Sequence, residues 1–308
     1  MTDIQVHQLQ NKHWQVGILP QTGASIAYGR VRYGGIWLDV MRPTPESDYH
    51  NSSLSSSFLM IPWSNRIRAG KFHFGGTTYQ LDDLKSDGTA MHGDVRGREW
   101  QVIYADDSKI RLAFNSTQQE NVNFPFKFQA EVEYKLRDTD FITIIKLKNI
   151  DHRDYPAGFG LHPYFVRGND VNDALVKIPC DMHYVLENAL PTTGIPDSLP
   201  ENLDFRELRA LDKQVIDDVF TTRISNQPAQ IIYPEWKLQL DYHADQLFKH
   251  FILFTPPNKP FFALEPVTNT NDGFNLYDKN IADTGVFLLR PNQEKQGIAF
   301  LRVKQNNT

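Results

Sequence analysis

Residues 128–147 read FQAEVEYKLRDTDFITIIKL, and apolar and polar side chains alternate in it from Phe128 to Arg137. A period of two sustained over this length predicts a strand with one buried face. After a polar break at 138–140, the alternation resumes over 141–147. Two such runs joined by a short polar break predict an antiparallel hairpin.

The same pattern recurs along the chain. Alternating runs predict two further hairpins, at 102–114 and at 72–81, where Gly75 and Gly76 suit a two-residue turn with positive φ. Further strand-like runs lie at 238–242, 251–254, 285–289 and 298–303. Many strands, with no regular alternation of strands and helices, predict an all-β fold, either a sandwich or a barrel of antiparallel sheets.

Two segments depart from the strand pattern. Leucines at 203, 208 and 211 have a spacing that predicts a short helix within 201–211. The segment 43–57 is rich in Ser and Pro and predicts a loop. Because strand-like runs lie on both sides of this loop, we interpret it as an excursion from one sheet system rather than as a linker. Length alone leaves one domain or two open.

Composition restricts the class of partner. The 308 residues carry 32 Lys and Arg against 37 Asp and Glu, a net charge of −5, with no basic block that could bind a row of phosphates. We therefore expect a polar small molecule and no nucleic acid. No apolar run approaches the ~18 residues of a membrane span. Segment 1–6 lacks the basic and apolar parts of a signal peptide, so we expect no membrane partner and a cytoplasmic location.

The residue types that bind metals and cofactors are present without the usual spacings. The ten histidines form no His-Glu-x-x-His or His-x-His motif, and the single cysteine, Cys180, has the setting of a small buried strand residue. Neither Gly-x-x-x-x-Gly-Lys-Ser/Thr nor Gly-x-Gly-x-x-Gly before a helix occurs, and Gly-x-Ser-x-Gly is also missing. We expect no metal and no organic cofactor.

Three titratable side chains lie in apolar settings beside a Gly or Pro that restrains the backbone. They are His92 in MHG, His162 in GFGLHPYF and Glu265 in FALEP. A buried carboxylate and a buried imidazole suit proton transfer, because burial and neighbours can move each pKa toward the working pH. A buried histidine or glutamate is also often only a structural residue, so the residues by themselves leave the function open.

Taken in order, these segments resemble the aldose 1-epimerase (galactose mutarotase) family over most of the chain. The matching segments are Asn65-Arg66-Ile67 with the glycine hairpin to Leu81, Met91-His92-Gly93 to Trp100, Leu161-His162-Pro163-Tyr164-Phe165, Asp217-Asp218-Val219-Phe220, Leu264-Glu265-Pro266 with Asp272-Gly273-Phe274-Asn275, and the closing run from Gly285 to Pro291. The resemblance implies one antiparallel β-supersandwich domain over residues 1–308. It also implies interconversion of the α and β anomers of a free aldose without a cofactor.

The resemblance also implies residue roles. Glu265 would be the general base on the anomeric hydroxyl, and His162 the general acid toward the ring oxygen. His92, Arg66 and Asn65 would bind sugar oxygens, and Asp217 would hold hydroxyls on the far side of the ring. Asp218 is the alternative to Asp217, which we favour because Phe220 then falls where the family has an aromatic residue. Trp63, Tyr164 and Phe274 are open to two interpretations, as faces for sugar stacking or as core residues.

Departures from the family pattern leave the substrate open. Many galactose mutarotases have Asn-His-Ser-Tyr-Phe at 161–165, a second Gly at Asp94 and Glu-Thr-Gln at 265–267, so this chain resembles a divergent bacterial branch. A hexose 6-phosphate is an alternative substrate, because Arg96 and Arg98 follow His92 and could bind phosphate, although such arginines are often solvated surface charges. A carbohydrate-binding protein without catalysis is a further alternative. We expect a sugar partner and a monomer or homodimer.

Overall fold

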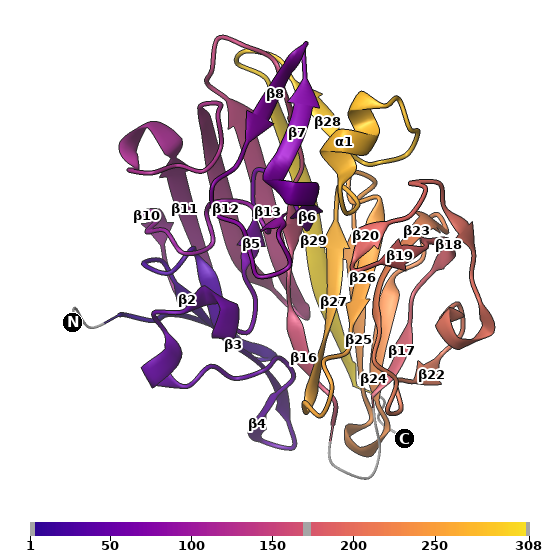
Figure 1. Cartoon of the computed structure of the whole chain (residues 1–308). Helices are drawn as coiled ribbons and strands as arrows, with labels where there is room; N and C mark the ends of the chain where they lie inside the picture. The colour runs from indigo at the N-terminus through magenta and orange to yellow at the C-terminus, as the bar shows by residue number, and fades with distance from the viewer. Residues whose placement is uncertain (1–3, 169–173, 306–308) are drawn as a thin grey trace.

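Two large antiparallel sheets dominate the computed structural model, which describes residues 4–168 and 174–305 (Figure 1). One sheet has nine strands in the order β10 (Gln101–Ala105), β11 (Lys109–Asn115), β12 (Phe128–Arg137), β13 (Asp140–Asn149), β29 (Glu294–Gln305), β25 (Leu238–Ala244), β24 (Ala229–Tyr233), β17 (Leu175–Lys177) and β22 (Arg209–Ala210). The C-terminal strand β29, yellow in Figure 1, therefore lies in the middle of this sheet.

The second large sheet has eight strands. Its path is β21 (Asp197–Ser198), β18 (Cys180–Tyr184), β23 (Asp217–Arg223), β26 (His250–Phe254), β27 (Phe261–Val267), β15 (Gly160–Leu161) and β5 (Leu59–Met60), and β16 (Tyr164–Val166) also pairs with β27. Every pair of strands in it is antiparallel.

Smaller elements surround these sheets. A four-stranded sheet contains β1 (His7–Gln10), β2 (Trp14–Leu19), β3 (Ser25–Tyr33) and β4 (Ile36–Asp39). The two-stranded pairs are β6 (Arg66–Ile67) with β9 (Ala90–Met91), β7 (Lys71–Phe74) with β8 (Thr77–Gln80), β14 (Tyr155–Ala157) with β28 (Phe287–Leu289), and β19 (Leu186–Glu187) with β20 (Leu190–Pro191). In the described part of the chain, the one α-helix is α1 (Gly273–Asp278).

The three expected hairpins are confirmed. Strands β12 and β13 pair from Phe128 with Asn149 to Arg137 with Asp140, and the apolar residues of the alternation are buried. The other two are β10 with β11 and β7 with β8, the latter closed by two glycines with positive φ. Cys180 is buried in β18, as its setting predicted, and burial raises the pKa of its thiol to about 12.

The helix expected within 201–211 is wrong. Only the single 3₁₀ turn Glu201–Leu203 forms, and the chain then extends into β22. Leu203 and Leu211 are buried, whereas Leu208 is 39% exposed, so the three leucines do not share one buried helical face. The loop expected at 43–57 is confirmed as mostly irregular chain with short 3₁₀ turns.

The eight-stranded sheet separates two hydrophobic clusters. The larger one contains residues from both large sheets and extends from Leu9 to Val303. The smaller one covers the other face of the eight-stranded sheet and contains Phe58, Met60, Tyr164, Tyr184, Val219, Ile252, Ala263 and Val267. Along β27, Phe262 and Leu264 belong to the larger cluster, whereas Ala263 and Val267 belong to the smaller one. Since side chains alternate, Glu265 lies on the face of the smaller cluster.

The extent of the larger cluster supports one domain over residues 1–308, which stays a prediction. Within the described ranges, no helix is long and apolar enough to cross a membrane. Residues 1–3, which form half of the N-terminal segment considered above, lie outside those ranges.

A buried histidine makes the fold sensitive to acid. His250 has no exposed surface, its Nδ1 lies 2.9 Å from Thr221 Oγ1, and burial lowers its pKa to about 4. In the unfolded chain a histidine titrates near 6.5. The unfolded state therefore binds the extra proton first, and stability is lost as the pH falls from about 6.5 to about 4.

We predict that His250→Gln removes this dependence. The unfolding free energy of the wild type should fall, relative to that of the variant, by about 1.4 kcal/mol for each pH unit in this window. Urea unfolding at several pH values measures the difference, and the exposed His50→Gln should keep the wild-type slope. Equal slopes for the wild type and His250→Gln would contradict the assignment.

Candidate active site

One row of side chains crosses three strands at the centre of the candidate site. Gly160 pairs with Met60 on one side and with Val267 on the other, and Tyr164 pairs with Ala263. With this register maintained, His162 lies directly opposite Glu265. The Nε2 atom of His162 is 3.1 Å from Oε1 of Glu265.

The His162 ring is held between two aromatic rings. Its centre lies 4.4 Å from that of Phe58 and 4.6 Å from that of Tyr164. The guanidinium of Arg42 in turn lies 3.9 Å from the centre of the Tyr164 ring. The tyrosine face is therefore used by protein groups, which favours a packing role for Tyr164 over sugar stacking.

Burial controls the proton affinity of the pair. The side chains of His162 and Glu265 are 6% and 3% exposed. Burial lowers the pKa of His162. Burial raises the pKa of Glu265 well above its usual value, and the negative charge of Asp217 adds to this effect, whereas Arg66 opposes it. Each group alone thus resists its charged form.

The short contact is consistent with one proton in the pair. Lone pairs on an imidazole nitrogen and a carboxyl oxygen would repel each other at 3.1 Å, so we infer that a proton lies between them. The other polar atoms, His162 Nδ1 and Glu265 Oε2, are buried and have no hydrogen-bond partner among the described residues. A buried polar atom without a partner is costly, and Glu265 Oε2, on the carboxyl group of the pair, is suited to bonding a ligand.

His92 lies beside this pair. Its ring centre is 5.2 Å from that of His162, and its Nδ1 is 2.9 Å from the sulfur of Met60. His92 has a φ of 67°, and the next residue, Gly93, also has a positive φ. A Cβ on Gly93 would lie 2.1 Å from the Ile61 carbonyl oxygen, so only glycine fits the turn that presents His92.

Arg66 begins β6 and pairs with Met91, the residue before His92, and Asn65 directly precedes β6. The Nε of Arg66 donates to Asp87 at 3.1 Å, and Nη1 donates to the Asn65 side chain at 3.5 Å. Asn65 is buried with a φ of 60°. The turn is held by the buried Asn269, whose Oδ1 accepts from the Ser64 backbone at 3.0 Å and whose Nδ2 donates to the Ser64 carbonyl at 3.0 Å.

Strand geometry distinguishes the two neighbouring aspartates. Asp217 is on the same side of β23 as Val219, which belongs to the smaller cluster on the Glu265 face. Asp218 is on the opposite side and lies 3.2 Å from His183 Nδ1. Burial raises the pKa of Asp217, while the charge of Arg66 lowers it. Asp217 is therefore the aspartate that shares a face with Glu265.

The remaining expected residues fall into two groups. Trp63 and Phe274 are each 1% exposed in the larger cluster, so the core interpretation applies to both. Arg98 donates to Asp94 and to the carbonyls of residues 120 and 121, so its guanidinium is occupied by the protein. Arg96 makes no hydrogen bond or ion pair within the described ranges, and its guanidinium lies 5.4 Å from the Phe58 ring centre.

Sequence reasoning missed Phe58, Met60, Arg42 and Asn269. Phe58 directly follows the segment expected to be a loop, Met60 lies two residues further on, and Arg42 directly precedes the segment, so the local pattern gave no reason to select them. Asn269 lies in a polar run, TNTND, that resembles a turn. In the described part of the chain, the candidate site included, no three His, Cys, Asp or Glu side chains are grouped as metal ligands.

Comparison with known proteins identifies the family. A family model described as aldose 1-epimerase matches residues 5–297. The chain belongs to the aldose 1-epimerase family. YihR, an uncharacterized protein of Escherichia coli strain K12, is 28% identical over 222 residues, which cover 70% of this chain and 71% of that protein.

Solved structures show the same fold as this aldose 1-epimerase family member. A galactose mutarotase-like protein from Clostridium acetobutylicum superposes with a TM-score of 0.85 at 18% identity and covers 99% of this chain and 100% of its own. An aldose epimerase homologue from C. elegans gives a TM-score of 0.84 at 16% identity, with coverage of 99% and 100%. The galactose mutarotase-like supersandwich expected from the sequence is thus confirmed.

Proposed function

We propose that this member of the family is an active aldose 1-epimerase that interconverts the α and β anomers of a free aldose. The observation that carries the proposal is the buried 3.1 Å contact between Glu265 and His162. In the reactive form, Glu265 is the carboxylate and general base, and His162 is the imidazolium and general acid. This form arises when the shared proton lies on His162, so the net charge of the pair does not change.

The close contact between Glu265 and His162 suits the opening of the sugar ring. The anomeric hydroxyl oxygen O1 and the ring oxygen O5 are bonded to the same carbon, C1, and an acid and a base in contact with each other can reach both. The O1 proton moves to Glu265, the C1–O1 double bond forms as the C1–O5 bond breaks, and His162 gives its proton to O5. After rotation about C1–C2, the reverse transfers close the ring with the opposite configuration.

Neighbouring side chains would stabilise charge during these transfers. His92 and Arg66 would donate to sugar oxygens that become more negative as the ring opens, and Asn65 supports the Arg66 guanidinium. Asp217, on the same face as Glu265, would accept from sugar hydroxyls. Because Arg66 already bonds Asp87, its orientation does not depend on the substrate. Metal and organic cofactors have no part in this scheme.

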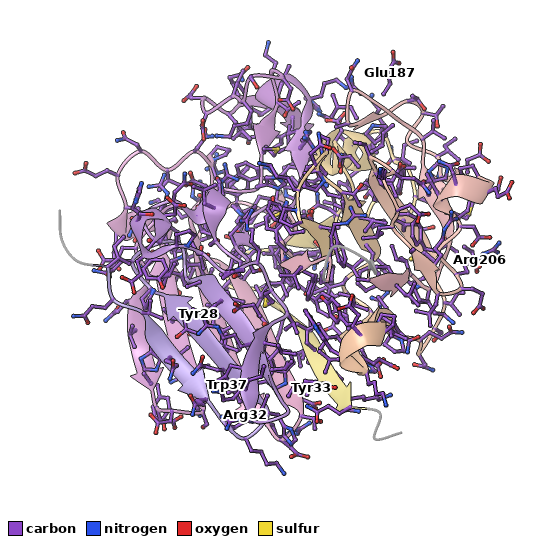
Figure 2. The ribbon with its side chains drawn as sticks, turned by 90° about the horizontal axis from the view of Figure 1, so that it is seen from below. Tyr28, Arg32, Tyr33, Trp37, Glu187 and Arg206 are labelled. Atoms are coloured by element: carbon purple, nitrogen blue, oxygen red, sulfur yellow. The ribbon has the colours of Figure 1, made fainter. Side chains whose placement is uncertain are left out.

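Removal of either proton-transfer group should abolish most of the activity. We predict that Glu265→Gln and His162→Asn each lower kcat by about 10²- to 10⁴-fold, the contribution typical of a positioned acid or base. NMR exchange between the anomers of glucose and galactose measures the rate. Glu187→Gln is the matched control, because Glu187 is exposed at the periphery of the molecule (Figure 2). Wild-type turnover in Glu265→Gln would refute the assigned base.

The two aspartates provide a paired test of substrate binding. We predict that Asp217→Asn raises KM by about tenfold or more, the loss expected for a charged hydrogen-bond acceptor, with a smaller effect on kcat. Asp218→Asn should leave both constants near wild type, because Asp218 is on the other side of the strand with His183. Steady-state anomer exchange separates the outcomes, and the opposite ranking would reject Asp217 as the sugar ligand.

A hexose 6-phosphate is a second candidate substrate, favoured by one observation. Arg96 makes no ion pair among the described residues, and its positive charge contributes to lowering the pKa of both His162 and His92. It thus places near the site a cation that forms no ion pair, although the charge of Asp83 partly opposes it. Arg98 does not support this candidate, because its donors are occupied by Asp94 and backbone carbonyls.

Substrate comparison decides between the two candidates. If the substrate is phosphorylated, kcat/KM should be at least tenfold higher for glucose 6-phosphate than for glucose, and Arg96→Ala should remove the difference. Arg206 is exposed at the periphery of the molecule in Figure 2, and the control variant Arg206→Ala should retain the difference in kcat/KM between the two sugars. Equal turnover of the two sugars excludes the phosphorylated candidate. A cytoplasmic location and a monomeric or homodimeric state also stay predictions.

A further inference from the structure

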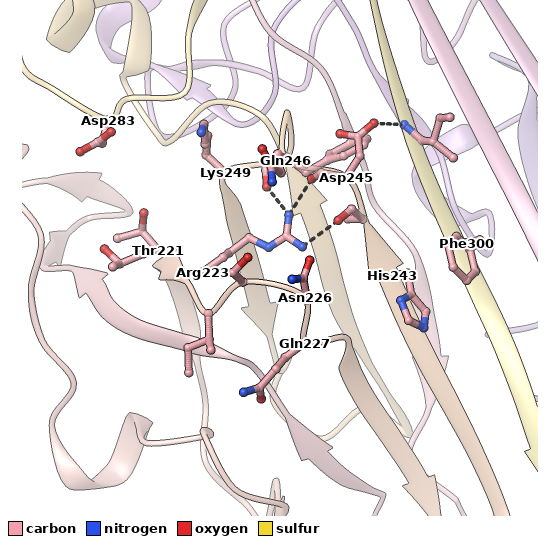
Figure 3. A pocket seen from close by; sticks show the side chains of 16 residues that line it. Thr221, Arg223, Asn226, Gln227, His243, Asp245, Gln246, Lys249, Asp283 and Phe300 are labelled. Atoms are coloured by element: carbon pink, nitrogen blue, oxygen red, sulfur yellow. Dashed lines mark hydrogen bonds between the residues drawn. The ribbon is translucent and has the colours of Figure 1, made fainter.

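A pocket of about 760 Å³ lies away from the Glu265–His162 pair (Figure 3). Its walls come from the end of β23 and the loop that follows, from the turn between β25 and β26, and from β29. None of the residues assigned to anomer exchange lines it. Its volume is in the range typical of small-molecule sites, about 300–1,000 Å³.

The pocket is built around a fixed arginine. Arg223 donates to the carbonyls of Ala244 and Asp245 at 2.8 Å, and also to that of Phe248, as the dashed lines in Figure 3 partly show. The Asp245 carboxylate accepts from the backbone of Ile298 at 2.6 Å. These bonds tie the 244–248 turn to β23 and to β29, so the walls are formed before a ligand arrives. Preformed walls reduce the entropic cost of binding.

Three carboxamide side chains line the pocket with their hydrogen-bonding groups free. Asn226, Gln227 and Gln246 are exposed, and within the described ranges their side chains make no hydrogen bond. A carboxamide offers both an acceptor oxygen and a donor NH₂ group. A ligand hydroxyl also donates and accepts, so neighbouring carboxamides are complementary to a molecule that carries several hydroxyls.

An aromatic pair supplies the apolar part of the lining. The rings of His243 and Phe300 stack with their centres 4.3 Å apart and their planes 9° from parallel, and both are only half-buried. The two rings cover each other's inner faces, and the Arg302 guanidinium lies 5.3 Å from the Phe300 ring centre, so the rings form an apolar wall of the pocket beside the free carboxamides rather than an open stacking face. An apolar wall next to free carboxamides suits a sugar, which has C–H groups as well as hydroxyls.

Charge in the pocket favours a neutral ligand. The terminal nitrogens of Arg223 donate to carbonyls, and its unpaired Nε is buried, so its guanidinium is not presented as an anion site. At the exposed positions, Lys249 and Asp283 have opposite charges. Because these two charges offset each other, a phosphate or carboxylate would gain little binding energy from them. A neutral polyhydroxylated molecule would bind without burying a charge of its own.

We propose that this pocket is a second saccharide site, which binds a neutral oligosaccharide of about two to three sugar rings and takes no part in anomer exchange. The assignment is independent of the proposed epimerase activity, because the pocket shares no lining residue with the Glu265–His162 site. Phe300 and His243 form the apolar wall of the site, and Gln246, Asn226 and Gln227 bind the hydroxyls.

Calorimetric titration with the methyl glycosides of maltotriose and cellotriose tests this site, because a methyl glycoside cannot open at its anomeric carbon. We expect at least one of them to bind the wild type, and Phe300→Ala to weaken its binding at least tenfold. Gln246→Ala should also weaken binding. Because this substitution changes only an exposed side chain in a turn, it provides a second test of the site if Phe300→Ala fails to fold. Exchange of glucose anomers should be unchanged in Gln246→Ala.

Gln101→Ala is the matched control, since Gln101 is an exposed carboxamide on β10, away from the pocket lining, and the variant should bind like the wild type. Three outcomes would overturn the proposal. They are the absence of binding of both trisaccharide glycosides, binding that neither pocket variant weakens, and binding of glucuronate or inorganic phosphate at the pocket in preference to the neutral glycosides.

Discussion

Glu265 and His162 are two ionisable groups buried side by side, and an isolated charge on either would cost several kcal/mol. Burial favours the neutral form of each group, so we infer that Glu265 carries the proton and donates it to His162 Nε2 across their 3.1 Å contact, which leaves the pair neutral. The same arrangement supplies chemistry, since moving that proton across the contact converts a resting acid into a carboxylate and an imidazolium. We infer that the requirement for one shared proton governs both the stability of the site and its reactivity.

The surrounding structure maintains this contact through elements distant in sequence. Strand β15 is paired with β5 on one side and with β27 on the other, so the His162 ring lies between Phe58 and Tyr164 and faces Glu265. The turns with positive φ at Asn65 and His92 bring further donors to the same face. Rigid strands and restrained turns together orient the groups before substrate binds, which lowers the reorganisation needed during reaction.

Local patterns predicted much of the fold. The hairpin at 128–147 could be predicted because alternation and a polar turn are properties of neighbouring residues. The helix expected within 201–211 failed because three leucines had a helical spacing without sharing a buried face. Phe58 could not be selected, because its role depends on pairing between strands far apart in the chain. Asp217 and Asp218 could not be separated by strand period alone, since Val219 and Phe220 are both apolar and both faces of β23 are covered. The family resemblance supplied the roles of Glu265 and His162, and the structure adds their distance and burial.

A crystal structure of the wild-type protein with bound glucose or galactose is the most direct measurement of the central claim. The account predicts O1 within hydrogen-bonding distance of the Glu265 carboxylate and O5 within hydrogen-bonding distance of His162 Nε2, with Asp217 on the hydroxyls across the ring. A hexose bound on this face with O1 and O5 directed away from both groups would contradict the account.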